Sequence, residues 1–210
     1  MTSFKRLQIY NHRKEFLFKY LKGGNILDIG NIGGICADGN SSSFHFEIIT
    51  KCLTSTVYGL DLFPPPAVDK YLYKNQKQHD LNNPLPYKDD FFDTVYMGEV
   101  LEHLGNPLFT LQEIQRCLKP KGVFVFDVPN PYSINRILKY TLSRKEDLGD
   151  CTHLIFYTPA ALSRLITYAG FELIEMATNW KLGKKYSIIP RKFRSGLGYN
   201  LLVSCKIPDE

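Results

Sequence analysis

The sequence predicts an α/β fold with a doubly wound, mainly parallel seven-stranded sheet and an antiparallel last strand. The first observation is that short apolar runs, rich in β-branched and aromatic residues, alternate with helical patterns or long polar stretches. The second is that several of these runs end on an acidic residue or a glycine. Such endings are typical of strands that reach the ligand-binding edge of an open parallel sheet.

Seven runs have the length and composition of strands, and the third is the weakest. They span residues 25–30, 56–62, 74–81, 91–97, 122–128, 171–177 and 200–206. About twenty residues without a clear helical pattern separate the last two runs. We therefore expect these two to form an antiparallel hairpin at the sheet edge rather than another crossover.

Helical patterns mark an N-terminal amphipathic helix within residues 1–22 and the segments 46–53, 99–118 and 158–170. We expect Pro107 to break the third of these helices internally. In the last one, Thr158 is a natural N-cap, Pro159 fits the first helical position and Gly170 closes the end.

Composition predicts one globular domain over residues 1–210, because 44% of the residues are hydrophobic and 22% are charged. No apolar run approaches the roughly 20 residues that a membrane-spanning helix needs. The first residues are too polar for a secretory signal. We therefore expect a cytoplasmic protein without a transmembrane segment.

The net charge of +5 gathers in two basic segments, residues 5–14 and 181–194. An anionic acceptor, a nucleic acid or a membrane surface would fit such segments, and a solvated basic face fits them equally well. The five cysteines form no C-x-x-C pair. This spacing argues against a zinc knuckle and against a secreted disulfide framework.

Acidic and glycine residues gather where the predicted strands end. The strand-end residues are Asp28, Gly30, Asp61, Asp80, Met97, Gly98, Glu99 and Asp127. The carboxyl ends of parallel strands meet at one rim, so these carboxylates would form a negatively charged mouth. A single strand-end aspartate is usually a cap or a turn former, but repetition along the rim indicates a binding site.

The chemistry of this rim favours a cationic nucleoside. The first turn, GNIGG, lacks the G-x-G-x-x-G spacing of dinucleotide sites, and Asp28 would repel a pyrophosphate there. Asp61 is placed to accept hydrogen bonds from both hydroxyls of a ribose, and Asp80 could accept one from the amine of adenine. A ligand with adenine, ribose and a positive centre but no phosphate is S-adenosylmethionine.

Five stretches carry a family resemblance: LDIGNIGG, YGLDL, HDLNNPLPYKDDFFDTVYMGEVLEHL, LKPKGVFVFDVPN and HLIFYTPAALSRLITYAGFELIE. In this order they resemble the class I S-adenosylmethionine-dependent methyltransferases of the type 11, or ubiquinone-biosynthesis-like, group. The resemblance covers about residues 25–175 and implies a Rossmann-like methyltransferase fold. It further implies cofactor-binding roles for Asp28, Gly30 and Gly34 in the first turn, Asp61 and Leu62 at the ribose, Asp80 and Leu81 at the adenine, and Met97 and Gly98 at the methionine part.

The sequence departs from the family pattern in the first turn. Ile32 stands where the middle glycine of D-x-G-x-G-x-G is expected, and residues 35–46 lengthen the connection between Asp28 and Asp61. A reshaped turn would weaken cofactor binding, because a small residue there lets backbone and cofactor touch. A non-catalytic S-adenosylmethionine-binding module is therefore one alternative function.

Methyl transfer from a sulfonium requires a positioned nucleophile and no covalent intermediate. If the acceptor is a hydroxyl, a general base would help, and the candidate catalytic residues are His153, His103 and Glu99. The resemblance places His153 near the acceptor pocket. A structural hydrogen bond to a neighbouring strand is the alternative role for this histidine.

Glu99, Glu102 and His103 are spaced to share one face of a helix and could together hold a divalent cation. The resembling ubiquinone O-methyltransferases are thought to use such a cluster for metal, whereas many relatives keep the motif without one. Helix capping with an internal ion pair explains the spacing equally, and we assign no residue as a metal ligand.

Two segments, residues 130–152 and 179–198, are expected to form acceptor-side loops. The first lacks a firm strand or helix pattern, and the second mixes aromatic with basic residues. The predicted function is S-adenosylmethionine-dependent O-methylation of a small-molecule, sugar or lipid-linked acceptor. Methylation of RNA is an alternative, because basic residues interleaved with aromatics also suit a single strand.

Overall fold

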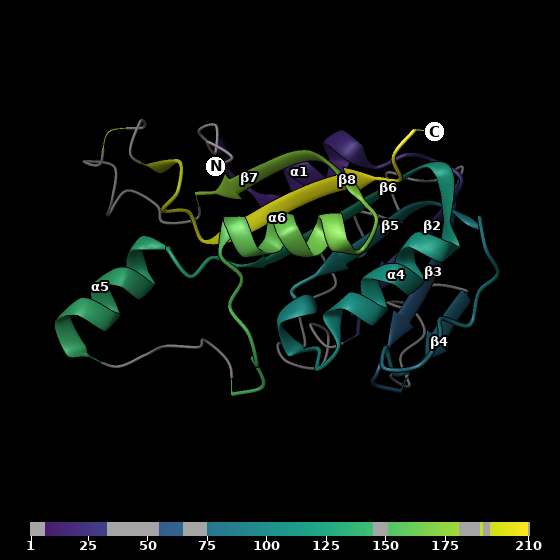
Figure 1. Ribbon diagram of the computed structural model, residues 1–210, viewed down its shortest axis with the longest axis horizontal. Coiled ribbons are helices and arrows are strands. Elements are labelled where there is room, and N and C mark those ends of the chain that lie inside the picture. The colour runs from purple at the N-terminus through teal and green to yellow at the C-terminus, as the bar shows by residue number, and fades with distance from the viewer. Residues whose placement is uncertain are drawn as a thin grey trace.

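The computed structural model describes residues 7–32, 55–64, 75–144, 151–180, 190 and 194–209. One eight-stranded sheet runs through the molecule in the order β1-β7-β8-β6-β5-β2-β3-β4 (Figure 1). The strands are β1 (Gln8–Tyr10), β2 (Asn25–Ile29), β3 (Thr56–Asp61), β4 (Asn75–Gln78), β5 (Phe92–Gly98), β6 (Leu118–Pro129), β7 (Glu172–Asn179) and β8 (Asn200–Lys206). All seven predicted strands are confirmed as β2 to β8, and the α/β class with a mainly parallel sheet is confirmed with them.

The predicted helix within residues 1–22 is wrong in its first half, because the described part of that segment begins with a strand. β1 pairs in parallel with β7, Gln8 opposite Ala177. Helix α1 covers only Arg13–Tyr20, and the ring of His12 caps it by accepting a hydrogen bond from the amide of Lys14. Pairing with the open edge of β7 satisfies backbone groups that a longer helix would have left beside an unpaired strand. Within the described residues the sheet consequently has eight strands rather than seven.

β7 and β8 form the predicted antiparallel hairpin. β8 lies between β7 and β6 and is antiparallel to both, whereas every other strand pair of the sheet is parallel. The expected place of the hairpin at the sheet edge is therefore wrong by one strand, because β1 covers the outer side of β7.

Helices lie on both faces of the sheet, as a doubly wound fold requires. On one face, α4 (Pro107–Cys117) and α6 (Pro159–Tyr168) cover the larger apolar cluster, which includes Phe124 and Val203. On the other face, α1 packs Phe16 and Leu17 against Val125. Figure 1 shows α4 and α6 on the near side and α1 behind the sheet. The predicted helix at 46–53 lies outside the described residues.

The predicted helix at 99–118 is two elements. A 3-10 turn, η2 (Leu101–His103), precedes α4, which begins at Pro107 with the side chain of Asn106 as its N-cap. The predicted interruption at Pro107 is therefore confirmed, and Pro107 itself starts the second element, because a proline at the first helical position needs no amide hydrogen bond. The prediction for α6 is confirmed, since the hydroxyl of Thr158 accepts a hydrogen bond from the amide of Ala161.

Candidate functional site

A cavity of about 670 Å³ opens at the carboxyl ends of β2, β3 and β5. This volume falls in the range of small-molecule sites. Nine of the predicted site residues line it, namely Asp28, Gly30, Asp61, Leu62, Asp80, Leu81, Gly98, Glu99 and His103. The structure thus brings together residues from four separate stretches of the chain at the rim where strand-end side chains were expected to meet.

Gly30 makes the first turn sharp enough to admit a ligand. Its φ of +77° is a conformation that L-residues with a side chain rarely adopt, and its amide donates to the carbonyl of Leu60 over 2.8 Å. A Cβ built on it would lie 2.3 Å from Cγ2 of Val100. Asp28 precedes this turn as a fully buried residue of β2. The backbone of Gly30 and the carboxylate of Asp28 therefore both border the cavity.

Asp61 is held in place by the backbone around it. Its Oδ2 accepts a hydrogen bond from the backbone amide of Ile32 at 2.6 Å, and its Oδ1 accepts one from the backbone amide of Phe63 at 2.9 Å. The carboxylate of Asp61 is 6% exposed at the end of β3. Ile32, which replaces the expected glycine, is fully buried in the interior and does not line the cavity.

The remaining predicted cofactor residues differ in their position relative to the cavity. Asp80 lines the cavity and also stabilises a turn, since its Oδ1 accepts a hydrogen bond from the backbone amide of Asn82 at 2.9 Å. Leu81 and Gly98 line the cavity as well. Met97 is fully buried in the core and does not line it, because side chains alternate between the two faces along β5. Gly34 lies outside the described residues.

Arg13 is a cavity-lining residue that the sequence did not reveal. Its Nη1 lies 2.9 Å from Oε2 of Glu99 and 3.3 Å from Oδ2 of Asp127. The charge of Asp127 is the main cause that raises the pKa of Arg13. No local motif marks this arginine, because its place depends on the long-range pairing of β1 with β7 and on the packing of α1.

Asp127, one of the predicted rim acids, lies beneath the cavity and does not line it. It is 2% exposed, and burial raises the pKa of its carboxyl group against the opposing effect of Arg13. Its Oδ1 accepts a hydrogen bond from the hydroxyl of Tyr96 at 3.1 Å, and its Oδ2 accepts one from the side-chain amide of Asn200 at 2.6 Å. Asp127 therefore serves as an anchor that ties β6, β5, β8 and α1 together below the site.

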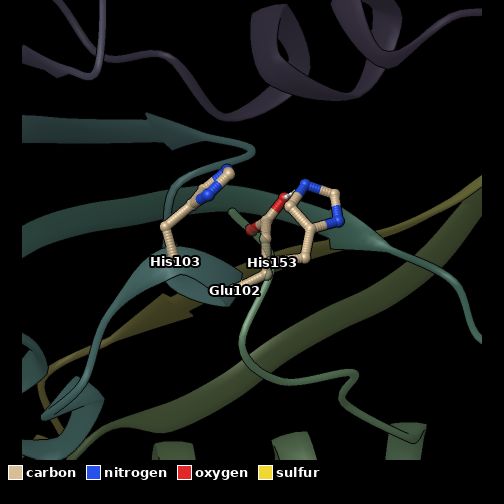
Figure 2. Close-up of side chains that lie close together, drawn as sticks. All are labelled: Glu102, His103 and His153. Carbon is tan, nitrogen blue, oxygen red and sulfur yellow. Dashed lines mark ion pairs between the residues drawn. The ribbon is translucent and has the colours of Figure 1, made fainter. Parts of the chain in front are cut away.

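A second cluster joins Glu102 and His103 of η2 with His153 from a distant segment. Figure 2 shows the carboxylate of Glu102 and the ring of His153 close together, with His103 beside them. Nε2 of His153 lies 3.9 Å from Oε1 of Glu102, and the two histidine rings are 4.6 Å apart. One ligand atom from each residue can be chosen so that all lie within 4.8 Å of one another.

Glu102 is the unusual member of this cluster. It is fully buried, and neither carboxylate oxygen has a hydrogen-bond partner among the described residues. Burial raises the pKa of Glu102 to about 8. Its carbonyl accepts the amides of Leu154 and Ile155, at 2.8 and 3.3 Å, which fixes the segment after His153 against η2.

The predicted grouping of Glu99, Glu102 and His103 on one helical face is wrong. Glu99 has a φ of +53° and precedes the 3-10 turn, so the residues do not follow one helix. The side chain of Glu99 pairs instead with Arg13. His153, which was predicted only as a candidate base, takes the third place in the cluster. Thr152, which lines the cavity, hydrogen-bonds to His103 and so links cluster and cavity.

The predicted acceptor-side loop at 130–152 contains a helix that the sequence pattern did not reveal. This helix, α5, spans Ile134–Ser143, and the chain is again described from Cys151. Of the other predicted loop, 179–198, the described residues are 179, 180, 190 and 194–198.

Comparison with known proteins agrees with this architecture. A family described as methyltransferase domain matches residues 3–176. The chain is 26% identical over 187 residues to a ubiquinone biosynthesis O-methyltransferase of Aeromonas salmonicida, covering 84% of this chain and 72% of the relative. A structure of a SAM-dependent methyltransferase from Archaeoglobus fulgidus superposes with a TM-score of 0.63 at 18% identity, covering 92% of each chain.

A structure of the 1,6-didemethyltoxoflavin-N1-methyltransferase of Burkholderia thailandensis, solved with S-adenosylhomocysteine bound, superposes with a TM-score of 0.59 at 16% identity. That comparison covers 94% of this chain and 77% of the other. At these identities the solved structures establish the shared fold, while the family match extends over most of the sequence. The chain belongs to the methyltransferase domain family and is a class I S-adenosylmethionine-dependent methyltransferase.

Proposed function

We propose that this protein transfers the methyl group of S-adenosylmethionine to an oxygen of a small-molecule, sugar or lipid-linked acceptor. The observation that carries the proposal is that the strand-end cavity, lined by Asp28, Gly30 and Asp61, adjoins the pair His103 and His153. A donor site and a candidate base therefore lie next to each other. The ubiquinone biosynthesis O-methyltransferases among the relatives support oxygen as the accepting atom.

The donor would lie along the rim. Asp61 would accept the ribose hydroxyls, and Asp80 and Leu81 would flank the adenine, because these residues follow successive strands around the cavity. The guanidinium of Arg13 faces the cavity near the end of β5 and would attract the carboxylate of the methionine part. The buried negative charge of Asp28 would favour the cationic donor over the neutral product.

In the proposed reaction the acceptor oxygen attacks the methyl carbon as the carbon–sulfur bond breaks, and the electron pair of that bond stays on sulfur. The neutral thioether product is S-adenosylhomocysteine. The hydroxyl proton passes to the imidazole of His153, whose position is fixed by the contact of its segment with η2. Most of the acceleration would come from alignment of the two substrates, and proton removal would add about 100-fold or more.

The test is a methyl-transfer assay with phenols, catechols, sugars and lipid-linked phenols as acceptors, analysed for the atom that receives the methyl group. His153→Gln should lower kcat by about 100-fold or more and leave the affinity for S-adenosylhomocysteine unchanged. His79→Gln serves as the control, because His79 neither lines the cavity nor belongs to the cluster of Glu102, His103 and His153. Transfer to nitrogen alone, or full activity of His153→Gln, would overturn the proposal.

A metal-assisted version of the same reaction is the second candidate, favoured by the buried carboxylate of Glu102 between two imidazoles. A cation held by Glu102, His103 and His153 would polarise the acceptor hydroxyl and lower its pKa. One carboxylate and two imidazoles suit zinc, manganese or iron better than magnesium.

Calorimetric titration of the chelator-treated protein with zinc or manganese tests the cation site without an activity assay, and methyl transfer in the presence of chelator then separates the two versions. Binding that Glu102→Gln abolishes would establish the cation site. Full methyl transfer in the presence of the chelator, with no heat of metal binding, would leave His153 as the base.

A further inference from the structure

Helix α5 presents an apolar face that nothing in the described residues covers. It contains no buried residue. Ile137, Leu138 and Leu142 lie three, four and eight residues after Ile134, so these four side chains share a face. Leu142 is 81% exposed, and Ile137 and Leu138 are each 39% exposed. Contiguous exposed apolar side chains of this kind indicate an interaction surface.

The charged residues of α5 and of its C-cap are all positive. Arg136 lies on the side of α5 that meets the protein body, Lys139 borders the apolar face, and Arg144 ends the helix in a left-handed conformation with a φ of +52°. Residues 128–144 contain no acidic side chain. An apolar stripe bordered by arginine and lysine is the pattern of helices that lie in the interface of a membrane.

The first turn of α5 is attached to the body of the protein, whereas the rest projects from it (Figure 1). The amide of Ile134 donates to the carbonyl of Leu197 over 3.1 Å. The guanidinium of Arg136 lies 4.8 Å from the ring centre of Phe156. Because β6 leads into α5 from the carboxyl ends of the strands, the helix stands at the same edge of the sheet as the cavity.

We propose that α5 docks this edge of the protein onto an anionic lipid bilayer. The apolar face enters the boundary between headgroups and acyl chains, while Lys139 and Arg144 contact lipid phosphates. Ten residues of helix extend about 15 Å, too short to cross a bilayer, and no helix in the described part of the chain is long and apolar enough to do so. The inference rests on the proposed function, since a bilayer would present a lipid-linked acceptor to the cavity.

Charge favours a bilayer over a second copy of the chain as the occupant. Two copies that met symmetrically through α5 would bring Lys139 and Arg144 of each near those of the other, with no acidic residue on the helix to offset them. Anionic headgroups complement the same charges. Long lysine and arginine side chains also reach from an apolar boundary to the headgroup level.

The experiment is co-sedimentation of the full chain with vesicles of phosphatidylcholine, with and without phosphatidylglycerol, at low and high salt. We expect binding to the anionic vesicles that weakens with salt. Leu138→Ser with Leu142→Ser should weaken it by about tenfold per leucine. Lys139→Glu with Arg144→Glu should weaken it by about fivefold per charge.

Matched controls lie on α6. Tyr168→Ser removes an exposed apolar side chain, and Arg164→Glu reverses an exposed charge, so both should bind like the unchanged protein. Titration with S-adenosylhomocysteine shows that each variant is folded and tests the cofactor site separately from the membrane surface.

Three results would overturn the proposal. One is no binding to anionic vesicles by protein that binds S-adenosylhomocysteine. Another is binding by both α5 variants that equals that of the controls. The third is a concentration-dependent dimer, seen by ultracentrifugation without lipid and abolished by the leucine substitutions, because a second copy would then cover the face.

Discussion

The proposed donor side and the proposed acceptor side of the strand-end rim are built in different ways. On the donor side, Gly30 and Asp61 lie at the ends of their own strands, so neighbouring residues in the sequence determine their place. On the acceptor side, Glu102 meets His153, which a distant segment brings to η2. Local pattern therefore identifies a donor site, whereas an acceptor site depends on contacts between segments far apart in the chain.

The sharpest test of the donor side is Gly30→Ala. The new methyl group would lie 2.3 Å from Cγ2 of Val100, in a backbone conformation that alanine adopts with strain. Movement of the turn should lower the affinity for S-adenosylhomocysteine by about 100-fold or more, which calorimetry would measure.

Gly105→Ala is the matched control, because a Cβ there meets nothing within 4 Å. Val100→Ala combined with Gly30→Ala should restore part of the affinity by removing the clash. Unchanged affinity in Gly30→Ala would mean that the donor does not lie against this turn.

On the acceptor side, we expect Glu102 to make the stability of the protein depend on pH. The pKa of Glu102 is raised from 4.5 to about 8, so the folded protein holds a proton that the unfolded chain releases above its own pKa. The contribution of Glu102 to the free energy of unfolding is therefore complete below about pH 4.5 and is lost as the pH rises towards 8. In Glu102→Gln this loss, on the order of a few kcal/mol, should disappear.

Thermal unfolding between pH 4.5 and 8.5 measures the effect, with Glu172→Gln on exposed β7 surface as the control. A melting temperature that depends on pH equally in all these proteins would show that Glu102 is not buried as a neutral acid. The donor and acceptor sides would then differ less than we propose.

Arg13→Gln tests the anchor between the two sides. The substitution leaves Asp127 buried without its cation and removes the contact with Glu99. Because Arg13 is 29% exposed, we expect a loss of about 2 kcal/mol in the free energy of unfolding, less than for a fully buried pair. Denaturant titration compares it with Lys14→Gln, which should change stability little.

The smallest expected effect belongs to a helix cap far from the chemistry. Thr158→Ala removes the hydrogen bond to the amide of Ala161 and should cost about 1 kcal/mol, with unchanged cofactor affinity. Thr158→Ser keeps the hydroxyl and should restore the stability. A change in S-adenosylhomocysteine binding in Thr158→Ala would show that α6 and the donor side are coupled.

The sequence contained most of the sheet because apolar runs and strand-end acids are local signals. It also identified the cap at Thr158, since a cap needs only its own first turn. It missed β1, which forms by pairing with the edge of β7, and α5, whose apolar stripe is short and lies in a segment read as a loop.

The site follows the same division. Asp28, Gly30 and Asp61 were predicted correctly as neighbours at one rim. Arg13 and the partnership of Glu102 with His153 were not, because no spacing in the sequence records them. Glu99 was placed on a helix that its backbone does not form, since a positive φ interrupts the helical pattern.

The central claim is that the strand-end cavity holds S-adenosylmethionine with Asp61 at the ribose. Calorimetric titration with S-adenosylmethionine, S-adenosylhomocysteine and NAD, on the unchanged protein and on Asp61→Asn, tests it most directly. We predict that the first two bind and NAD does not, and that Asp61→Asn weakens binding by about 30-fold while the surface variant Asp89→Asn does not. Folded protein that binds neither S-adenosyl compound would contradict the account. So would an Asp61→Asn variant that binds both compounds as tightly as the unchanged protein does.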